Sequence, residues 1–521
     1  MSIPEECKIL VIGGGPGGAY TASVLAREGI DVVLLEADHF PRYHVGESML
    51  PSLRHYLKFI DLDSTFDNHG FTKKVGAAFK LSPNHEEGYT DFVGVGGPNS
   101  YSWNIIRSEA DEMMLRHAQK SGAQVFEGVK VNSVEFAQMN GLRNGTNGTS
   151  DSQSAHPHPG RPVSASYSRK EDGLTGVIKF DYIVDASGRT GLLNTKYLKD
   201  RHYSDGLKNV ANWGYWKGTG KYSPGTEREN IPYFEALRDE SGWAWFIPLH
   251  DGTTSVGIVQ NQELAKKAKA AASSTREYYE RAIKLVPTIS ALIGDAELTP
   301  NLRSASDYSY SSSCYAFPYA RVVGDAGCFI DPFFSSGAHI ALTGGLSAAA
   351  TISAAIRGDC SEEVAAQWHS NKITESYARF LIVVLSAYKQ ILNQQDYVLS
   401  DFGENNFDRT FNFFKPIIQG TADATNKLTQ AEFSGAINHI TQAMFRPNSV
   451  TYLTKEDVKA AKPTQAEQEL IDGIRKRQAQ HLHSVEDFTT NVIDGRIPRL
   501  QRGNLGLMAF ESAKSDSICS T

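Results

Sequence analysis

The chain has 521 residues, of which 40% are hydrophobic and 21% are charged, and this composition is typical of a soluble globular protein with two or three domains. Its formal net charge is −7, so the sequence offers neither the basic surface that binds nucleic acid nor the polybasic segment that anchors a protein to a membrane. We therefore expect no nucleic-acid partner and no membrane association.

The N-terminal region begins with a short apolar strand at Lys8–Ile12, which leads directly into a glycine-rich turn at residues 13–18. A helical run follows at residues 19–26, and a second apolar strand at residues 32–35 ends at Glu36. Strand, glycine turn, helix, strand and acid in this order are typical of a dinucleotide-binding unit. The sequence therefore predicts a bound dinucleotide.

Each position of this motif has a physical role. Gly13 permits the tight turn, Gly15 lets a pyrophosphate approach the backbone, and Gly18 lets the helix pack closely against the strand. The free N–H groups of the helix N-terminus face the anion. We expect Glu36 to accept hydrogen bonds from the ribose hydroxyls.

The middle of the chain combines strands with one polar insertion. Asp111–Ser121 is predicted to be a helix, and Tyr182–Gly188 is predicted to be a strand that ends in a second turn near the nucleotide. Between the strand-like segments 131–136 and 176–180, residues 140–173 are rich in Ser, Gly, Asn, His and Pro. We expect this segment to be a long, mobile insertion in a hairpin, without a chemical role.

The second half of the chain begins with aromatic strands and ends with helices. Trp243–Leu249 and Thr254–Val259 flank Asp251-Gly252 and predict a β-hairpin. A strand at residues 322–323 precedes a glycine turn, and a helix of small residues is predicted up to about Ile356. From Ser361 onward the pattern is helical, and the longest stretches are residues 362–392, 430–444 and 466–480.

These elements predict an α/β fold in which a nucleotide-binding domain is interleaved with an antiparallel-sheet substrate domain and followed by a C-terminal helical region. The predicted segments are 1–70, 100–200 and 310–360 for the nucleotide-binding domain, 71–99 and 201–309 for the substrate domain, and 361–521 for the helical region.

The five cysteines are scattered, without CxxC pairs or zinc-type spacing, which favours a reducing compartment and predicts neither disulfides nor a metal site. The first apolar strand lies close to the N-terminus, so we expect no signal peptide. The most apolar run, Phe380–Leu385, is far too short to span a bilayer. We therefore expect a cytoplasmic enzyme.

Two segments carry candidate reactive or wall-forming side chains. In a strand over residues 70–79, Lys74 shares its face with small residues and can project into a cavity, whereas Lys73 lies on the opposite face. By composition alone, a solvated lysine is the more common outcome. Trp243 and Trp245 share one face of their strand, which by itself is typical of core aromatics.

Three nucleotide-contacting turns favour FAD over NAD, because Arg107 and Asp325 match positions at which FAD enzymes hold their cofactor. Across residues 5–360 the sequence resembles the single-Rossmann flavoprotein monooxygenase superfamily. This superfamily contains aromatic hydroxylases, flavin-dependent halogenases and prenyl reductases, so the fold alone does not select the reaction.

Four motifs together resemble the flavin-dependent halogenases. They are the Trp-x-Trp-x-Ile-Pro of residues 243–248, the Lys-x-Gly strand at Lys74, Gly46-Glu47-Ser48, and Asp331-Pro332-Phe333-Phe334-Ser335-Ser336-Gly337. The sequence is most similar to fungal halogenases of phenolic polyketides, such as those of resorcylic acid lactone pathways. Residues 138–172 are the least matched part.

The resemblance implies a mechanism and a set of ligands. Reduced FAD and O2 convert chloride to hypochlorous acid, which moves through an internal tunnel to Lys74. Lys74 then delivers the chlorine, either as a chloramine or as a hydrogen-bonded hypochlorous acid. Ser336 and Gly337 bind the chloride, at a helix start where backbone N–H groups favour a small anion; Ser336 is also a candidate N-cap. The implied FAD contacts are Gly13, Gly15, Gly18, Glu36, Glu47, Arg107 and Asp325.

The resemblance also indicates the substrate. Tryptophan halogenases carry a glutamate two residues before the Ser/Thr-Gly pair, and this chain has Phe334 there, which favours a phenol over free tryptophan. The base that deprotonates the phenol stays open among His339, Glu47 and Asp111. The C-terminal helices are expected to cover the substrate end of the cavity. Their aromatic residues are more typical of helix packing than of a substrate pocket, and they are Phe407, Phe411, Phe413 and Phe414.

The leading interpretation is an FADH2-dependent halogenase that chlorinates an electron-rich phenol of a polyketide type. A separate flavin reductase is implied, because no sequence feature indicates a dedicated NADH site. The alternative is an aromatic hydroxylase driven by NAD(P)H, against which the bulky Trp243 and Trp245 argue. A third interpretation is a non-catalytic flavin-binding protein in which Lys74 has no chemical role.

Overall fold

The computed structural model describes residues 2–83, 87–137, 158–394, 488 and 492–510. The predicted helices at 430–444 and 466–480 and the phenylalanines between 407 and 414 lie outside the described residues. The same holds for residues 138–157 of the predicted insertion.

The first large sheet is built around the parallel strands that the N-terminal motif predicts. Its main order is β19-β20-β10-β1-β2-β7. In addition, β9 pairs with β10, and β8 pairs with β9. Strands β1 and β2 are almost entirely buried, as expected where helices cover a parallel sheet. The strands are β1 (Glu6–Ile12), β2 (Val32–Leu35), β7 (Gln124–Phe126), β8 (Val129–Ala137), β9 (Arg161–Arg169), β10 (Thr175–Asp185), β19 (Ala316–Phe317) and β20 (Ala320–Val322).

Part of the predicted insertion is a strand of this sheet. Residues 161–169 form β9, which pairs antiparallel with both β8 and β10. The prediction that 140–173 form one insertion is therefore wrong for β9. Its Ser-rich composition hides the strand pattern, because pairing on both sides, rather than intrinsic propensity, places this segment in the sheet.

The second large sheet is antiparallel except for one pair. Its order is β16-β12-β15-β14-β13-β4-β5, with β17 paired to β12, and β4 runs parallel to β13. The predicted hairpin is confirmed as β14 and β15. The strands are β4 (Gly76–Lys80), β5 (Gly88–Asp91), β12 (Asn209–Lys217), β13 (Tyr233–Ala236), β14 (Gly242–Pro248), β15 (Thr253–Asn261), β16 (Glu297–Leu298) and β17 (Arg303–Ser306).

The predicted strand over residues 70–79 is divided at Val75. Its first part is β3 (Thr72–Lys74), which pairs with β6 (Ser102–Asn104), whereas its second part is β4 of the antiparallel sheet. The Val75 carbonyl accepts a hydrogen bond from Phe92 N at 3.0 Å instead of joining either ladder. The prediction of one continuous strand is therefore wrong, because two different partners capture its halves.

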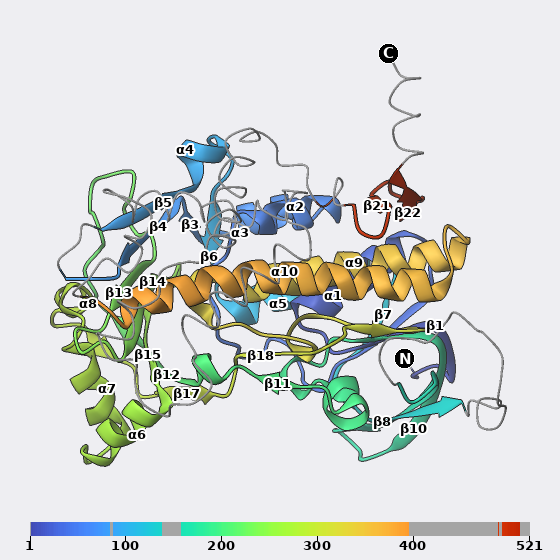
Figure 1. Ribbon diagram of the computed structural model, residues 1–521, viewed down its shortest axis with the longest axis horizontal. Helices are drawn as coiled ribbons and strands as arrows, with labels where there is room; N and C mark the ends of the chain where they lie inside the picture. Colours follow the sequence, from blue (N-terminus) through green and yellow to red (C-terminus); the bar gives the residue numbers. More distant parts are fainter. Residues whose placement is uncertain (1, 84–86, 138–157, 395–487, 489–491, 511–521) are drawn as a thin grey trace, which may run out of the picture.

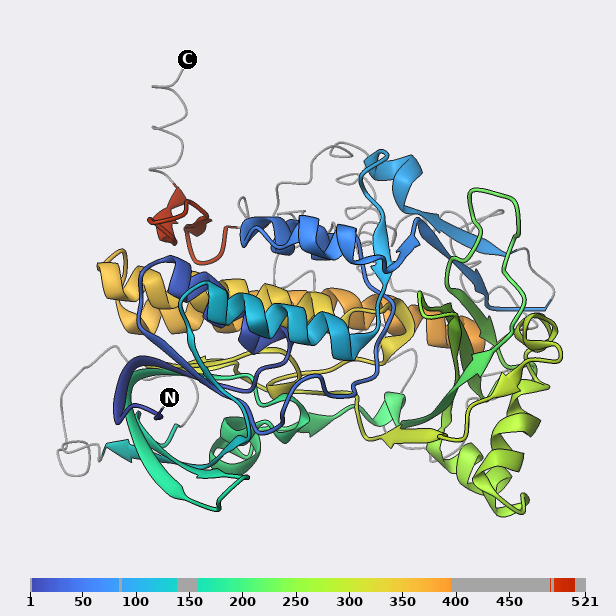
Figure 2. The same cartoon turned by 180° about the vertical axis from the view of Figure 1, so that it is seen from behind.

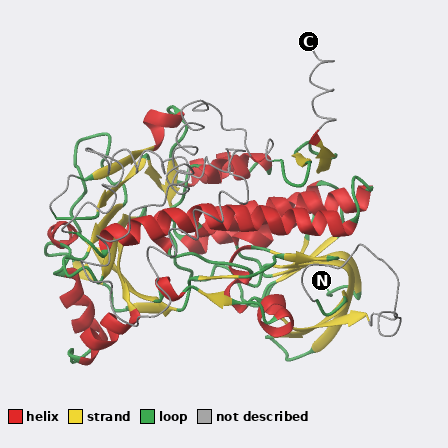
Figure 3. Ribbon diagram, viewed as in Figure 1, coloured by secondary structure: helices red, strands yellow, loops and turns green. Residues whose placement is uncertain are grey.

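Long helices join the two large sheets. Helices α9 (Gly337–Arg357) and α10 (Glu362–Ile391) pack side by side along the long axis, and the sheets lie toward its opposite ends (Figures 1 and 3). Helix α9 also packs on α1 (Pro16–Arg27), which contacts α5 (Arg107–Lys120), as the reverse view shows (Figure 2). The C-terminal part of α10 reaches β14 and places its side chains over the antiparallel sheet.

Among the described residues, one helix is long and apolar enough to cross a bilayer. This helix is α9, and 89% of its most apolar window is buried inside the protein. Such burial is typical of a core helix. Its alanines and glycines permit close packing against α1 and α10.

The remaining elements are short. The helices are α2 (Ser52–Phe59), α3 (Asp63–His69), α4 (Phe92–Gly96), α6 (Gln262–Ala270), α7 (Thr275–Ile283) and α8 (Pro287–Ile293). Two small strand pairs are β11 (His202–Tyr203) with β18 (Tyr310–Ser311), and β21 (Arg496–Arg499) with β22 (Gly506–Ala509). Short 3₁₀ turns lie at Gly188–Thr190, Asp205–Leu207, Gly324–Ala326 and Pro332–Phe334, and a π-helical turn lies at Leu192–Leu198.

The architecture confirms the predicted α/β class, with a parallel nucleotide-type sheet, an antiparallel sheet and C-terminal helical structure. The β21–β22 hairpin, which contacts α9, was not anticipated within the predicted helical region. The domain boundaries themselves stay a prediction.

Candidate active site

The glycine turn has the steric form that a dinucleotide requires. Gly13 has a φ of +97°, and a Cβ there would lie 2.3 Å from the Ala186 carbonyl oxygen. A Cβ on Gly18 would lie 2.0 Å from the Gly13 carbonyl oxygen. At Gly15, by contrast, the nearest atom to such a Cβ is Arg42 Nη2 at 3.4 Å. Two glycines therefore close the turn, and the third leaves room in front of the backbone for a pyrophosphate.

Glu36 lies directly after β2, as predicted, and is mostly buried. Its Oε2 accepts a hydrogen bond from Gly14 N at 2.5 Å, and its Oε1 accepts one from Asp38 N at 2.7 Å. The carboxylate thus fixes the glycine turn from the next strand. Its contact with a ribose stays a prediction.

Arg107 and Asp111 form an ion pair on the first turns of α5. Arg107 Nε and Nη2 donate to the two Asp111 oxygens at 2.8 and 2.9 Å, and Arg42 Nη1 lies 3.1 Å from Asp111 Oδ2. Burial by itself raises the pKa of Asp111, but the charge and hydrogen bonds of Arg107 outweigh it and hold that pKa below its usual range. An ionised carboxylate bound by two guanidinium groups is a poor proton acceptor, which argues against Asp111 as the base.

Three cofactor candidates that are far apart in sequence share one electrostatic environment. The charges of Glu47 and Asp325 both act on Arg107. Burial raises the pKa of Asp325 to about 6, against the opposing charge of Arg107. Burial also raises the pKa of Glu47. The structure therefore brings together three of the residues that sequence analysis assigned to FAD from separate motifs.

Glu47 ends a chain of hydrogen bonds that sequence analysis missed. Its Oε1 accepts a hydrogen bond from Tyr215 Oη at 2.7 Å, and that hydroxyl lies 2.9 Å from Tyr43 Oη. Trp213 Nε1 donates to Tyr43 Oη at 2.7 Å. Tyr43 precedes the Gly46-Glu47-Ser48 motif by three residues, but Tyr215 belongs to β12, and no spacing in the sequence links it to Glu47.

Lys74 ends β3 and is 2% exposed. Its Nζ donates hydrogen bonds to Ser48 Oγ at 2.7 Å and to the Met49 carbonyl at 2.9 Å. It also lies 5.2 Å from the centroid of the Phe92 ring. Burial lowers the pKa of Lys74 from 10.5 to about 7, so the neutral amine is accessible near neutral pH.

Lys73, the rival lysine, has a different environment. It is exposed, and its Nζ lies 4.5 Å from the centroid of the Tyr101 ring. The alternation within β3 therefore directs one lysine outward and the other inward. The preference for Lys74 agrees with this burial.

Asn104 connects the Lys74 strand to the tryptophan strand. It belongs to β6, the partner of β3, and forms a bridge with Ser48. Its Nδ2 donates to the Pro248 carbonyl at 3.1 Å, at the end of β14. The strand that carries Lys74 and the strand that carries the two tryptophans are thus connected through one buried residue, which the sequence did not indicate.

Ser336 immediately precedes α9, and Gly337 is its first residue. The Ser336 side chain is fully buried, and among the described residues its Oγ has no hydrogen-bond partner. The interpretation of Ser336 as an N-cap through its side chain is therefore wrong, since no cap hydrogen bond forms. An unpaired buried hydroxyl beside free helix N–H groups fits a bound anion.

The Asp331–Gly337 segment packs against the tryptophan strand. The rings of Phe333 and Trp243 lie 4.9 Å apart, and Phe334 packs on Phe79 at 5.5 Å. Asp331 lies beneath this aromatic cluster, and burial raises its pKa to about 6. Phe334, which stands where tryptophan halogenases carry the glutamate, is therefore part of an apolar wall.

A buried polar network holds this wall on α10. Tyr388 Oη donates to Asp331 Oδ2 at 2.7 Å and accepts a hydrogen bond from Trp243 Nε1 at 2.7 Å. Asn209 Nδ2 donates to Asp331 Oδ2 at 3.1 Å and to Tyr388 Oη at 2.8 Å. Sequence analysis missed both Tyr388 and Asn209, because neither belongs to a motif with a recognisable spacing.

His339 lies inside the helical layer. Its Nδ1 is 2.8 Å from Ser52 Oγ, and its ring contacts Tyr56 and Phe380 with centroid separations of 5.9 and 5.2 Å. The side chain therefore packs between α2, α9 and α10.

Comparisons with known proteins agree with this geometry. A family model described as tryptophan halogenase matches residues 8–99 and 90–448. The flavin-dependent halogenase ascD of Acremonium egyptiacum is 54% identical, and the alignment covers 99% of this chain and 95% of that protein. The sulochrin halogenase gedL of Aspergillus terreus is 48% identical, with coverage of 98% and 95%.

A solved structure shares the fold and the same kind of activity. The myxobacterial chondrochloren halogenase CndH, described as a variant of FAD-dependent halogenases, matches with a TM-score of 0.66 and 27% identity. The match covers 90% of this chain and 98% of that chain.

Proposed function

Because this chain belongs to the tryptophan halogenase family and is a flavin-dependent halogenase, we propose that it chlorinates an electron-rich phenolic ring of a polyketide-type substrate through Lys74. The observation that carries the proposal is the buried Lys74 amine, whose pKa is lowered to about 7. The similarity to a sulochrin halogenase and the apolar Phe334 position support the substrate class.

The residues at the glycine turn and in the neighbouring loops and helix fit FAD. The space in front of Gly15 accommodates a pyrophosphate, Glu36 and Glu47 offer carboxylate acceptors, and Arg107 with Asp325 completes the charged set. When bound and reduced, FAD supplies the electrons with which O2 is activated to oxidise chloride.

Ser336 and Gly337 hold the chloride. The hydroxyl of Ser336 would donate to the anion, and the first backbone N–H groups of the 21-residue helix α9 would add further donors. The hydroxyl is buried and has no hydrogen-bond partner among the described residues, so chloride would satisfy this donor.

Lys74 transfers the chlorine. Its neutral amine attacks the chlorine of hypochlorous acid, so that an N–Cl bond forms while the O–Cl bond breaks, and the amine proton leaves with hydroxide as water. The phenolic ring then takes the chlorine from nitrogen, and the ring proton at that carbon is released as the N–H bond re-forms. Only the neutral amine has the lone pair that this step needs, which gives the lowered pKa its role.

A separate flavin reductase supplies FADH2 in this proposal. The test combines the purified protein with FAD, NADH, a flavin reductase, chloride and a panel of simple resorcylates and phenolic lactones. The expected product gains one chlorine in place of hydrogen, with the chlorine isotope pattern in its mass spectrum.

Each arm of this test addresses one part of the proposal. A product that gains oxygen instead of chlorine overturns the proposed reaction. Chlorination with NADH in the absence of reductase overturns the two-component arrangement. Chlorination of free tryptophan in preference to every phenol overturns the substrate class.

A further inference from the structure

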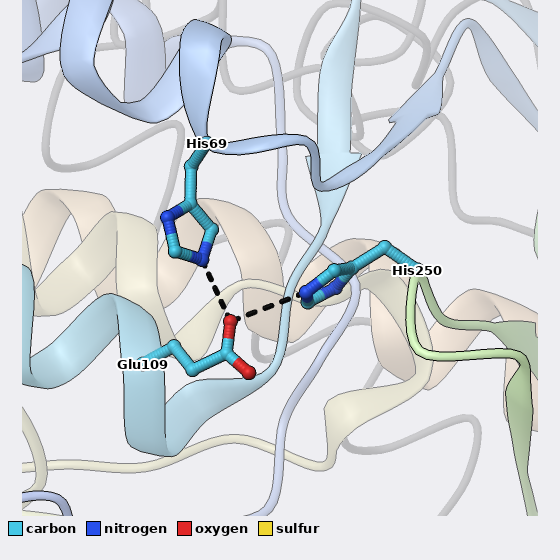
Figure 4. Close-up of side chains that lie close together, drawn as sticks. All are labelled: His69, Glu109 and His250. Carbon is cyan, nitrogen blue, oxygen red and sulfur yellow. Dashed lines mark hydrogen bonds and ion pairs between the residues drawn. The ribbon is translucent and has the colours of Figure 1, made fainter.

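Three metal-binding side chains from distant parts of the sequence converge on one point of the structure. His69 is the last residue of α3, Glu109 lies in the first turn of α5, and His250 follows β14 (Figure 4). One ligand atom from each lies within 4.8 Å of the others. The two imidazoles approach the same carboxylate oxygen, Glu109 Oε2, at 2.7 and 3.2 Å.

Phe71 holds the two imidazole rings in this arrangement. Its ring centroid is 4.4 Å from that of His69 and 5.2 Å from that of His250. The two imidazoles are themselves 5.8 Å apart in an edge-to-face arrangement. The positions of both rings are therefore set by packing as well as by the carboxylate, and this preorganisation lowers the cost of binding an ion.

The two ring nitrogens of His250 have different surroundings. Its Nε2 faces Glu109, whereas its Nδ1 is buried and has no hydrogen-bond partner among the described residues. Two ring nitrogens and one carboxylate oxygen thus lie close enough together to share one ion. Ligand atoms around a tetrahedral Zn²⁺ are about 3.3 Å apart at the usual bond lengths near 2.0–2.1 Å. The 3.2 Å separation from His250 already matches this spacing, whereas the 2.7 Å separation from His69 would have to open by about 0.6 Å for an ion to enter.

The donor set selects among metals. Two imidazoles with one carboxylate suit Zn²⁺ and similar transition metals, whereas Mg²⁺ and Ca²⁺ prefer oxygen ligands. His69 and Glu109 also line a surface hollow of about 450 Å³, together with Glu112 and His117. A metal held by three protein ligands keeps a fourth position for water.

We propose that His69, Glu109 and His250 form a binding site for a divalent transition-metal ion, with Zn²⁺ as the best fit. The ion ties α3 and the start of α5 to the turn between β14 and β15. It thereby connects the helix that begins with Arg107 to the strand that carries Trp243. The site is independent of the halogenation chemistry, so its test does not use chlorination as a readout.

The experiment uses the FAD-loaded protein after chelator treatment and desalting. One equivalent of ZnCl2 is added, free metal is removed, and bound zinc is measured by mass spectrometry. The wild type should retain one Zn²⁺ per chain and melt several degrees higher with zinc than without. Titration with Co²⁺ should give the visible absorption of a tetrahedral site.

Variants separate the site from non-specific binding. His69→Gln changes an exposed residue and Glu109→Gln a half-buried one, so the fold should persist by circular dichroism while zinc affinity falls at least tenfold. His117→Gln alters a histidine of the same hollow that lies outside the cluster, and it should bind zinc as the wild type does. The proposal is overturned if the wild type retains no stoichiometric zinc, or if the His69→Gln/Glu109→Gln double variant binds zinc and gains melting temperature as the wild type does.

Discussion

The amine of Lys74 donates a 2.7 Å hydrogen bond to the hydroxyl of Ser48, so a lysine at the end of β3 and the Gly46-Glu47-Ser48 turn form one buried polar unit. The same unit contacts the Met49 carbonyl but includes no ion pair with a described carboxylate. A buried amine with neutral hydrogen-bond acceptors alone is not held in its charged form. Its lowered pKa therefore follows from burial, and the adjacent Glu47 links this unit to the proposed cofactor site.

Replacing Lys74 by Ala should remove chlorinated product, by at least a hundredfold in rate, because the side chain that carries the chlorine is gone. Oxygen-dependent reoxidation of reduced flavin should persist, and both are measured in one stopped-flow and mass-spectrometric assay. Lys73→Ala is the matched control and should chlorinate normally, since Lys73 is exposed. Retained chlorination in Lys74→Ala would remove the lysine from the mechanism.

Chlorination should lose rate as the pH falls below about 7. The pKa of Lys74 is lowered to about 7, so the neutral amine predominates above that pH and the protonated amine below it. The rate should then fall about tenfold per pH unit on the acid side. Chemically reduced flavin replaces the reductase in this measurement, so that the reductase does not contribute its own pH dependence. A chlorination rate that stays constant between roughly pH 5.5 and pH 8, a range that brackets this pKa, would contradict the role of the neutral amine.

Lys74→Met should change the pH dependence of stability. In the unfolded chain the amine keeps a pKa near 10.5, and in the folded chain its pKa is about 7. Between these values the unfolded state binds more protons, so this group makes the wild type more stable as the pH rises. The slope is at most about 1.4 kcal/mol per pH unit.

The corresponding measurement is urea unfolding at several pH values. The free energy of unfolding of Lys74→Met, relative to the wild type, should be higher at pH 7 than at pH 10. Lys73→Met should show no such difference. Parallel curves for Lys74→Met and the wild type would show that the amine is not buried as described.

Ser336→Ala should weaken chloride use without weakening the fold. The Ser336 hydroxyl is buried, and its removal costs no hydrogen bond to any residue that the structure describes. The KM for chloride should rise several-fold while the KM for the phenol is unchanged. Ser353→Ala is the matched control, because the Ser353 hydroxyl, inside α9, is also buried and has no hydrogen-bond partner in the described part of the chain. An unchanged chloride KM in Ser336→Ala would exclude Ser336 as a chloride ligand.

Gly15→Ala and Gly18→Ala should separate cofactor binding from folding. A Cβ at Gly15 meets only Arg42 at 3.4 Å, so the apoprotein should unfold as the wild type does, while FAD affinity falls roughly tenfold or more because the methyl group occupies the pyrophosphate approach. A Cβ at Gly18 would lie 2.0 Å from a backbone oxygen, which should cost about 1–3 kcal/mol of stability. Denaturation of the apoprotein and FAD titration by fluorescence measure the two effects. Equal FAD affinity in Gly15→Ala would contradict the assigned role of Gly15.

Local patterns were sufficient for much of the fold. The βαβ order around Gly13 to Glu36 and the turn at Asp251-Gly252 are short-range signals, and both elements are confirmed. The resemblance to fungal flavin-dependent halogenases is confirmed as well, and the hydroxylase alternative gains no support from the related proteins. In contrast, β9 was missed because its place in the sheet depends on two partners rather than on its own composition.

The sequence by itself determined the nucleotide-binding motif and the α/β class, and it placed Lys73 and Lys74 on opposite faces of a strand, because backbone sterics and the alternation of side chains act over a few residues. Only the tertiary structure decided that Ser48 and Asn104 hold the Lys74 strand, that Tyr388 joins Asp331 to Trp243, and that two histidines meet at Glu109. These contacts join residues that are tens to hundreds of positions apart. Their positions depend on how strands and helices pack, and no spacing along the chain encodes that packing.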